Sequence, residues 1–393
     1  MLHMFRGPRI TIGVLLLLAV VLTACGGPSS ASWSGLASDD ANLIYVAHGD
    51  RVVAVNPLSG ATRWEYPNED DRDAQFYAVP LVADGTLFIG DYKGRMHAVN
   101  AETGAPQWLY EPEKDTLIGP ISLTSDDRVI SGAAVSDDKV FFGLGSRNVV
   151  AVSRESAAEI WTFETEHGVW AQPLYVPADQ AIDQQATLYI VSLDHRLYAI
   201  DPESGDQLWR MNLGGAAPGA PVYDQERGRL YIGTFVSEML AIDLAQRQIV
   251  DRYATENWVW GSPVLENVDD GDDMLYFGDL EGYLYALRLT DNGFESEWKQ
   301  AVANDAIRAT PLLTNGLVIV GSKDHHVYAV SKESGATEWE QQTEGEVLTE
   351  LVFVPREEDD DEASGLAVVG TSEGDERVIA LNVESGDVSW RYS

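Results

Sequence analysis

The chain has 393 residues, of which 45% are hydrophobic and 23% are charged. This composition excludes an intrinsically disordered protein and supplies enough apolar residues for a large core. A formal net charge of −37 disfavours binding to nucleic acid and to anionic lipid headgroups, because like charges repel one another.

The first 24 residues have the pattern of a secretory signal. Arg6 and Arg9 precede an apolar run over residues 10–22, and small residues follow this run. Such a run is too short to span a bilayer, and a basic start with a small-residue cleavage site is typical of a signal peptide. The sequence therefore predicts a signal peptide over residues 1–24 and export of the rest of the chain.

The predicted cleavage site contains the only cysteine of the chain, which excludes intramolecular disulfides. Leu22-Thr23-Ala24-Cys25 resembles a bacterial lipobox, in which the cysteine receives acyl chains such as palmitate. We expect a lipidated Cys25 and a flexible tether over residues 25–38; the alternative is a chance cysteine in an ordinary signal sequence. The anchor would face the periplasm from the outer membrane if the source has two membranes, or the cell surface if it has one.

One sequence unit recurs along the rest of the chain. It reads IVSLDHRLYAIDPESGDQLW over residues 190–209 and VGSKDHHVYAVSKESGATEW over residues 320–339. An alanine marks each of eight copies, at Ala54, Ala98, Ala151, Ala199, Ala241, Ala286, Ala329 and Ala380. Seven copies reach a tryptophan shortly afterwards, at Trp64, Trp108, Trp161, Trp209, Trp298, Trp339 and Trp390. The fifth copy has Tyr253 and no tryptophan.

Within each copy, the hydrophobic pattern has a period of two, which indicates β-strands. In one copy, the pattern predicts four short strands over residues 220–224, 229–235, 238–244 and 249–255. Turns such as DPESG and SKESG begin with Asp or Ser, which cap the turn backbone, and end with Gly, which accepts a left-handed conformation. No window keeps a period of 3.6, so we expect almost no helix.

Four strands per unit and eight units predict an all-β protein, an eight-bladed β-propeller of four-stranded antiparallel blades over residues 39–393. The repeated alanines would lie where neighbouring sheets approach closely, and the tryptophans would cover the seams between blades. Tandem β-sandwiches would need a longer period. The chain also lacks the Trp-Asp dipeptide of WD40 repeats and the regular Gly-Gly doublet of kelch repeats.

Two longer gaps between copies predict solvated loops, at residues 125–138 and 356–365. The acidic runs over 269–273 and 357–362 do not match an EF-hand loop. We expect solvated loops there, with adventitious cation binding as the alternative. His325 and His326 are neighbours in a predicted hairpin and would point to opposite faces, so they do not form a metal site. No metal site is predicted.

A proline opens the innermost strand of several copies: Pro80, Pro120, Pro173, Pro221, Pro263 and Pro311. The residues three positions earlier should surround the central channel at one face: Tyr77, Leu117, Trp170, Pro218, Trp260 and Arg308. Trp258 should have the orientation of Trp260. Aromatic and arginine side chains are enriched in binding hot spots, so we predict a partner- or ligand-binding mouth formed by Tyr77, Trp170, Trp258, Trp260 and Arg308. The alternative is that these rings plug the channel.

The repeat has a proline before an apolar strand, then Gly, Tyr-Ala-Ile/Val/Leu, Ser-Gly and Trp. It resembles the pyrroloquinoline-quinone-like propeller repeat over residues 33–393. Two classes share this repeat: quinoprotein dehydrogenases, and BamB-like lipoproteins, which are non-enzymatic eight-bladed scaffolds of the outer-membrane barrel-assembly machinery. A lipobox followed by little more than eight blades resembles the second class. Many dehydrogenases carry adjacent cysteines over the cofactor and bind Ca²⁺ through Glu, Asn and Asp, and these residues have no identifiable counterparts here.

The resemblance implies a non-enzymatic, membrane-anchored scaffold that binds other envelope proteins or peptides. From the acidic net charge, we expect no binding to nucleic acid. We expect a monomer within a complex, with no cofactor, pyrroloquinoline quinone included. Two alternatives stay open: a quinone-dependent dehydrogenase-like oxidoreductase, and an envelope ligand-binding or sensor propeller.

Overall fold

A computed structural model describes residues 34–39, 43–67, 74–112, 127–268, 272–314, 316–355, 364–372 and 376–393. The predicted signal peptide and Cys25 lie outside the described residues. Every described residue belongs to one compact unit, Ser32–Ser393. Within the described part of the chain, no helix has the length and hydropathy needed to cross a membrane.

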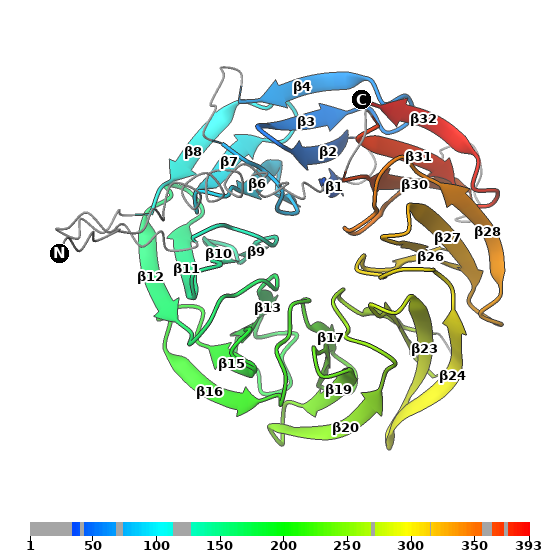
Figure 1. The fold of residues 1–393 in the computed structure, drawn as a ribbon. Helices are drawn as coiled ribbons and strands as arrows, with labels where there is room; N and C mark the ends of the chain where they lie inside the picture. The colour runs from blue at the N-terminus through cyan, green and yellow to red at the C-terminus, as the bar shows by residue number, and fades with distance from the viewer. Residues whose placement is uncertain are drawn as a thin grey trace, which may run out of the picture. The chain divides into compact units, whose positions relative to one another are not determined.

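The described residues form eight four-stranded antiparallel sheets arranged as blades around a ring, which confirms the predicted propeller (Figure 1). The first four blades are β1 (Gly35–Asp39), β2 (Leu43–His48), β3 (Arg51–Val55) and β4 (Thr62–Tyr66); β5 (Leu81–Ala83), β6 (Thr86–Gly90), β7 (Met96–Asn100) and β8 (Pro106–Tyr110); β9 (Ala134–Val135), β10 (Lys139–Gly143), β11 (Asn148–Ser153) and β12 (Glu159–Glu164); β13 (Leu174–Val176), β14 (Thr187–Val191), β15 (Arg196–Ile200) and β16 (Gln207–Asn212).

The other four blades continue in chain order around the ring (Figure 1). They are β17 (Val222–Asp224), β18 (Arg229–Gly233), β19 (Glu238–Asp243) and β20 (Gln248–Ala254); β21 (Val264–Glu266), β22 (Met274–Gly278), β23 (Tyr283–Thr290) and β24 (Gly293–Ala301); β25 (Leu312–Leu313), β26 (Leu317–Gly321), β27 (His326–Ser331) and β28 (Thr337–Gln342); β29 (Val352–Pro355), β30 (Gly365–Gly370), β31 (Val378–Asn382) and β32 (Val388–Tyr392).

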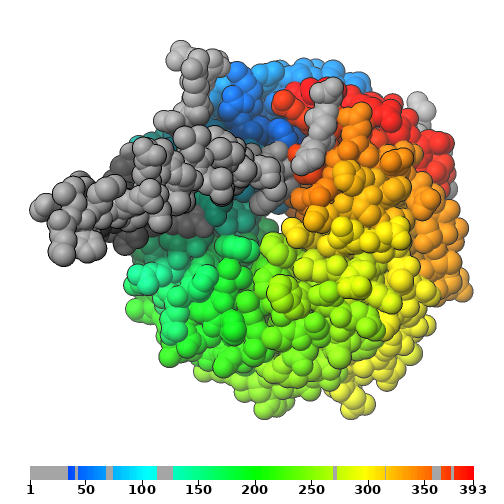
Figure 2. Space-filling view, in the orientation of Figure 1, coloured from blue at the N-terminus to red at the C-terminus, as the bar shows by residue number. Residues whose placement is uncertain are grey.

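The hydrophobic core lies between the blades. The two middle strands of each blade are apolar on both faces and almost wholly buried, as in IYVA of β2 and VVAV of β3. Each of the eight core clusters contains residues of two adjacent blades. The space-filling view shows blades packed flank to flank around a central hollow (Figure 2). Because one four-stranded sheet cannot cover its own faces, each blade depends on its neighbours for burial.

The repeated alanines and tryptophans occupy corresponding places in the blades. Ala54 pairs directly with Trp64, and a bulge follows the alanine. The indole N–H of Trp64 then donates to the carbonyl of Ala101 in the next blade, at 2.9 Å. The same kind of bond to the next blade is made by Trp108, Trp161, Trp298, Trp339 and Trp390. Trp209 instead lies under the Arg247 guanidinium, 5.7 Å from the ring centroid.

Turn glycines complete most of these seams. Gly104 has a φ of +69°, and a Cβ placed on it would lie 2.6 Å from the Trp64 ring. Gly60, Gly205, Gly335 and Gly386 face Trp390, Trp161, Trp298 and Trp339 in the same way. The Ser-Gly of the repeat therefore meets two needs, a left-handed turn and close approach of an indole.

The boundaries of two predicted segments need correction. The first blade begins at Gly35, where Gly35 pairs with Ala47, so residues 35–38 are part of the sheet and not of a flexible tether. Residues 127–138 are not a solvated loop, because they include β9 and the buried side chains of Val129 and Ala133. The other predicted loop lies mainly outside the described residues, at 356–363.

Candidate functional site

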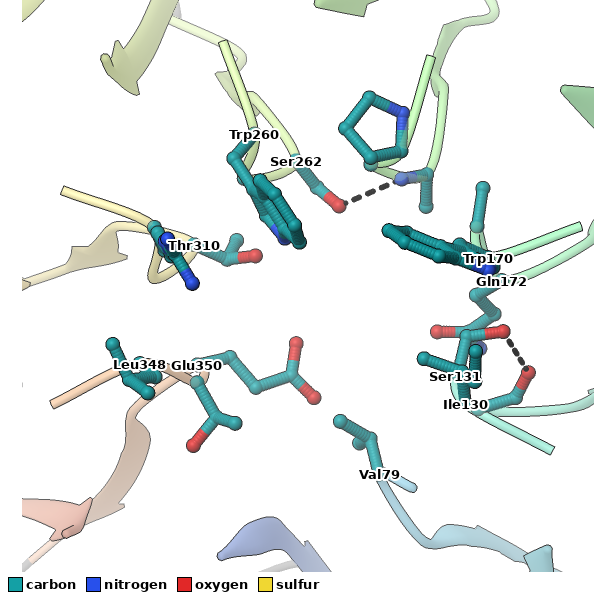
Figure 3. Close-up of a pocket in the computed structure, with 18 of the residues that line it drawn as sticks. Val79, Ile130, Ser131, Trp170, Gln172, Trp260, Ser262, Thr310, Leu348 and Glu350 are labelled. Carbon is teal, nitrogen blue, oxygen red and sulfur yellow. Dashed lines mark hydrogen bonds between the residues drawn. The ribbon is translucent and has the colours of Figure 1, made fainter. Parts of the chain in front are cut away.

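A cavity of about 320 Å³ lies in the central channel. Its described lining comes from seven of the eight blades. All of these residues except Tyr92 lie in the segments that lead into the innermost strands. Figure 3 shows these side chains converging on a common space from separate parts of the ring. A cavity of this size falls within the range of small-molecule sites, and it also suits a single large side chain.

Strand register places the lining residues in two layers. In each blade, the repeated alanine pairs with a residue of the second strand, and that residue pairs with one residue of the innermost strand, which we use as the reference position. In the fourth blade, Ala199 pairs with Tyr189, and Tyr189 pairs with the reference residue Leu174. Four positions before the reference residue, seven blades place these residues in the cavity wall: Tyr77, Ile130, Trp170, Pro218, Trp260, Arg308 and Leu348. Two positions before the reference residue, the same blades place Val79, Gly132, Gln172, Ala220, Ser262, Thr310 and Glu350. We call the first set the mouth layer and the second set the inner layer.

Four of the five predicted mouth residues line this one cavity: Tyr77, Trp170, Trp260 and Arg308. Trp258 does not line it. The Trp258 side chain is 47% exposed and stacks on Phe235, with ring centroids 4.9 Å apart. Residues 255–263 contain no strand, so the alternation that predicted a common orientation for Trp258 and Trp260 does not apply.

The third blade differs from the prediction made from its proline. Pro120 and Leu117 lie outside the described residues, and the innermost strand of this blade is Ala134–Val135. Its mouth-layer residue is therefore Ile130. The proline pattern misled here because Ala133 takes the place of the proline that opens the strand in other blades.

The mouth carries a connected aromatic cluster. Trp170 and Trp260 have ring centroids 6.0 Å apart, and Phe235 lies 5.2 Å from Trp260. The Arg308 guanidinium lies over the Trp260 ring at 4.6 Å, a cation–π arrangement. Both tryptophans are half-buried and border an open cavity. They therefore line the channel at this level and do not fill it.

A second pair of rings also lines the cavity. Tyr77 and Tyr92 have centroids 4.8 Å apart, and the Arg128 guanidinium lies 5.3 Å from the Tyr92 centroid. Burial, followed by the nearby charge of Asp50, raises the pKa of Tyr77 above its ordinary value of 10.0. The Tyr77 hydroxyl therefore stays protonated and can donate a hydrogen bond at neutral pH.

Close contacts between blades hold the inner layer in place. The Ser262 hydroxyl accepts a hydrogen bond from the Ala220 N–H at 2.9 Å, and the Gln172 amide donates to the Ala133 carbonyl at 2.8 Å. A Cβ on Gly261 would lie 2.7 Å from the Arg308 carbonyl oxygen, so only glycine fits there. These contacts link the third blade to the fourth, the fifth to the sixth, and the sixth to the seventh. They join adjacent blades at the wall of the cavity.

Glu350 is the carboxylate of the inner layer, and it was not predicted from the sequence. Figure 3 shows its side chain extending from the eighth blade toward the middle of the cavity. Burial raises the pKa of Glu350 from its ordinary value of 4.5 to about 7. The eighth blade has Leu351 where other blades have proline, so the proline alignment omitted it. Counting back from Ala380 through its strand partners Val368 and Val352 would have found Glu350.

The cavity does not fit a calcium–quinone centre. Ca²⁺ takes six to eight oxygen ligands, commonly from several carboxylates. Among the described residues that line the cavity, Glu350 is the only carboxylate. The described residues also contain no group of three or more His, Cys, Asp or Glu side chains placed to hold a metal ion.

The other metal candidates have structural partners. Asp273, predicted to lie in a solvated acidic loop, is buried and paired with Arg227. His326 contacts the Tyr328 ring, and His325 lies in a turn with a φ of +66°. Residues 269–271 and the run over 357–362 lie outside the described residues.

Comparison with known proteins gives the family. A family model described as outer membrane protein assembly factor BamB matches residues 26–168, 122–210, 146–291 and 255–393, which together span the chain from residue 26 to its end. The chain belongs to this family. Membership confirms the resemblance that the repeat predicted.

Individual members of the BamB family have low sequence identity to this chain. BamB of Yersinia pestis is 23% identical over 314 residues, which are 77% of this chain and 72% of that protein. The crystal structure of BamB from Moraxella catarrhalis matches with a TM-score of 0.63 at 20% identity, over 88% of this chain and 92% of that one. This structural match bears on the fold alone.

Quinoprotein dehydrogenases match at similar identity over less of their length. Quinoprotein ethanol dehydrogenase of Pseudomonas putida is 24% identical over 217 residues, which are 50% of this chain and 34% of that enzyme. The match thus spans about a third of the dehydrogenase. Both classes of protein that share this repeat, the BamB family and the quinoprotein dehydrogenases, are therefore found among the relatives.

Proposed function

We propose that this protein is a non-enzymatic scaffold of the cell envelope that binds other proteins or peptides through the mouth of its propeller. The observation that carries the proposal is the match to the BamB family model from residue 26 to the C-terminus. The dehydrogenase match covers half of the chain and a third of the enzyme. The family's printed description, an outer membrane protein assembly factor, is the basis for placing this chain in envelope protein assembly.

The proposal includes a lipid anchor on Cys25 and an extracytoplasmic location. Its support is the sequence: a basic start, a short apolar run, and Leu22-Thr23-Ala24-Cys25. A lipid would supply the membrane affinity that an acidic surface lacks, because anionic headgroups repel a protein with a formal charge of −37. The protein would act as a monomer within a larger complex.

Membrane attachment is tested by fractionating cells that express the wild type or Cys25→Ser. We expect the wild type in the membrane fraction and the variant in the soluble or precursor fraction, because the variant has no acceptor for the lipid. Normal processing of Cys25→Ser with full membrane retention would contradict the anchor.

Partner binding is tested by affinity purification from envelopes, comparing the wild type with Trp170→Ala and Trp260→Ala. We expect both variants to lose co-purified proteins while melting within a few degrees of the wild type, because these half-buried rings border a cavity. A large fall in melting temperature with unchanged capture by the folded fraction would show that the rings are structural.

The second candidate is a quinone-dependent oxidoreductase, favoured by the dehydrogenase relatives. It is tested by adding pyrroloquinoline quinone and Ca²⁺ to purified protein with alcohol or sugar substrates and a dye acceptor. We expect no turnover, since the described cavity offers one carboxylate. Stoichiometric quinone binding with turnover would replace the scaffold proposal.

A further inference from the structure

The inner layer of the cavity contains a carboxylate that has no ion-pair partner among the described residues. Glu350 extends into the middle of the space, and no hydrogen bond or ion pair involves its side chain in the described part of the chain. This is unusual in a protein where buried carboxylates are generally paired, as Asp91 is with Arg95 and Asp273 with Arg227. A charge left without a partner in a confined space favours binding of an opposite charge.

The two cations that line the cavity are each placed against an aromatic ring. Arg308 lies over Trp260, and Arg128 lies over Tyr92. Burial is the cause of the raised pKa of Glu350, with no part played by either arginine. Neither arginine forms a hydrogen bond or an ion pair with Glu350 among the described residues.

The walls next to Glu350 suit the apolar stem of a long cationic side chain. Figure 3 shows the rings of Trp170 and Trp260 directed into the same space as Glu350. Ser262 and Thr310 add hydroxyl groups at the level of Glu350. Aromatic faces beside a carboxylate recognise ammonium and guanidinium groups through cation–π attraction and charge-assisted hydrogen bonds.

The surface beside the mouth suits a polypeptide and not only a free amine. Phe235 joins the cavity tryptophan Trp260 to Trp258, which is 47% exposed. The neighbouring Val236 is 44% exposed. These side chains would contact residues on either side of an inserted one. The acidic net charge of the chain also favours approach of a basic segment.

We propose that the cavity receives a lysine or arginine side chain from a polypeptide partner, with the cationic group at Glu350 and the stem between Trp170 and Trp260. This proposal rests on the proposed scaffold function and specifies the chemistry of the partner segment. The polypeptide backbone would lie across the mouth beside Trp258.

The test uses purified protein and blocked pentapeptides with Lys, Arg, norleucine or Glu at the centre of a glycine-serine frame, plus n-butylammonium as a free amine. Ligand-observed NMR titration gives each dissociation constant at pH 8. We expect the Lys and Arg peptides to bind at least about tenfold more tightly than the norleucine peptide, because only they can pair with the carboxylate. The Glu peptide and n-butylammonium should bind more weakly than the Lys peptide.

Glu350→Gln should remove the preference for Lys and Arg over norleucine, since the amide keeps the shape of the side chain and loses the charge. Glu338→Gln is the matched control, because this exposed glutamate lies on β28 at the rim and its removal changes the net charge equally. We expect the control to bind the peptides as the wild type does.

Unchanged preference in Glu350→Gln, or tighter binding of the Glu peptide than of the Lys peptide, would overturn the assignment of the cavity to a cation. Equal affinity for n-butylammonium and the Lys peptide would overturn the assignment to a polypeptide. These results do not depend on envelope partners. A scaffold that uses another surface would fail this test and still co-purify with partners, so the two proposals can fail separately.

Discussion

At the scale of single residues, the central cavity is defined by what each blade places at the same two positions. Most of these residues are neutral, and Glu350 stands among them as the lone described carboxylate. It lies deep in the ring but faces the cavity, so its side chain is half-buried and keeps some contact with water. Burial in this confined space opposes ionisation and raises the pKa of the group to about 7.

Glu350 should make stability depend on pH. Because its pKa rises from 4.5 to about 7 on folding, the folded state holds the proton more tightly than the unfolded state. The stabilising contribution is therefore full below pH 4.5 and is lost as pH rises through 7. We expect Glu350→Gln to be more stable than the wild type at pH 8 by at most about 3 kcal/mol, and the difference to shrink toward pH 5.

Chemical denaturation of both proteins at pH 5, 6, 7 and 8 measures this difference. The other ionisable groups that line the described cavity are Arg128, Arg308, Tyr77 and Tyr92. The pKa of Tyr77 is raised above 10.0, so Tyr77 does not ionise over this pH range. Glu338→Gln again controls for the change in net charge. Parallel pH profiles for the wild type and Glu350→Gln would contradict the raised pKa.

At the scale of elements, the seams between neighbouring blades are closed by hydrogen bonds of two kinds. Six seams have an indole N–H bonded to a carbonyl of the next blade. The fifth blade has Asp251 paired with Ala241, at the place of the tryptophan. The Asp251 carboxylate accepts a hydrogen bond from the Phe294 N–H of the sixth blade at 2.7 Å. Tyr253 adds a bond to Ser296 at 3.2 Å.

Asp251→Ala should destabilise the protein by about 1–3 kcal/mol, because it leaves the Phe294 N–H without its acceptor. Asp251→Asn keeps an acceptor oxygen and should cost less than about 1 kcal/mol. Urea denaturation at fixed pH measures both changes in the free energy of unfolding. Equal losses for the two variants would assign the effect to charge and not to this hydrogen bond.

At the scale of the whole molecule, the ring is closed without exchange of a strand. Each blade is continuous in sequence. Among the described residues, the first and last blades meet through packing and a few polar contacts and share no strand. The Trp390 indole N–H donates to the Pro57 carbonyl at 2.8 Å. Thr349 donates to the carbonyl of Ser34 at 2.8 Å. These contacts join residues more than 300 positions apart, so they decide whether the ends of the chain stay together.

Trp390→Ala should therefore loosen both ends of the ring. We expect a loss of about 3–5 kcal/mol, typical for truncation of a large buried aromatic side chain. Amide hydrogen exchange should accelerate in the first blade, β1–β4, as well as in the last, β29–β32. Trp339→Ala removes the matching contact to Val383 between blades joined by the chain, so its effect should stay local. Identical exchange patterns in the two variants would contradict a special role for the closing seam.

The sequence alone determined the repeating unit and hence the fold. The alternation of apolar residues, the Ser-Gly turns and the spacing from Ala199 to Trp209 all act within one blade of 42–53 residues. Local patterns specify local hairpins. A unit that cannot bury its own faces must then stack on copies of itself. The repeat also predicted that Tyr77, Trp170, Trp260 and Arg308 lie around one channel, because residues at the same position of each repeat have the same orientation.

Only the tertiary structure decided which residues line the cavity and which residues join the blades. Each layer of the cavity takes one residue per blade, so its chemistry depends on the exact register in every blade. Register is fixed by strand pairing across the sheet and not by a proline, which is why Ile130 replaced Leu117 and Glu350 was missed. The seam made by Asp251 and Phe294 also had no sequence signal, because its two partners are 43 positions apart and belong to different blades. The pKa of Glu350 depends on burial by residues from several blades, which exists only once the ring has closed.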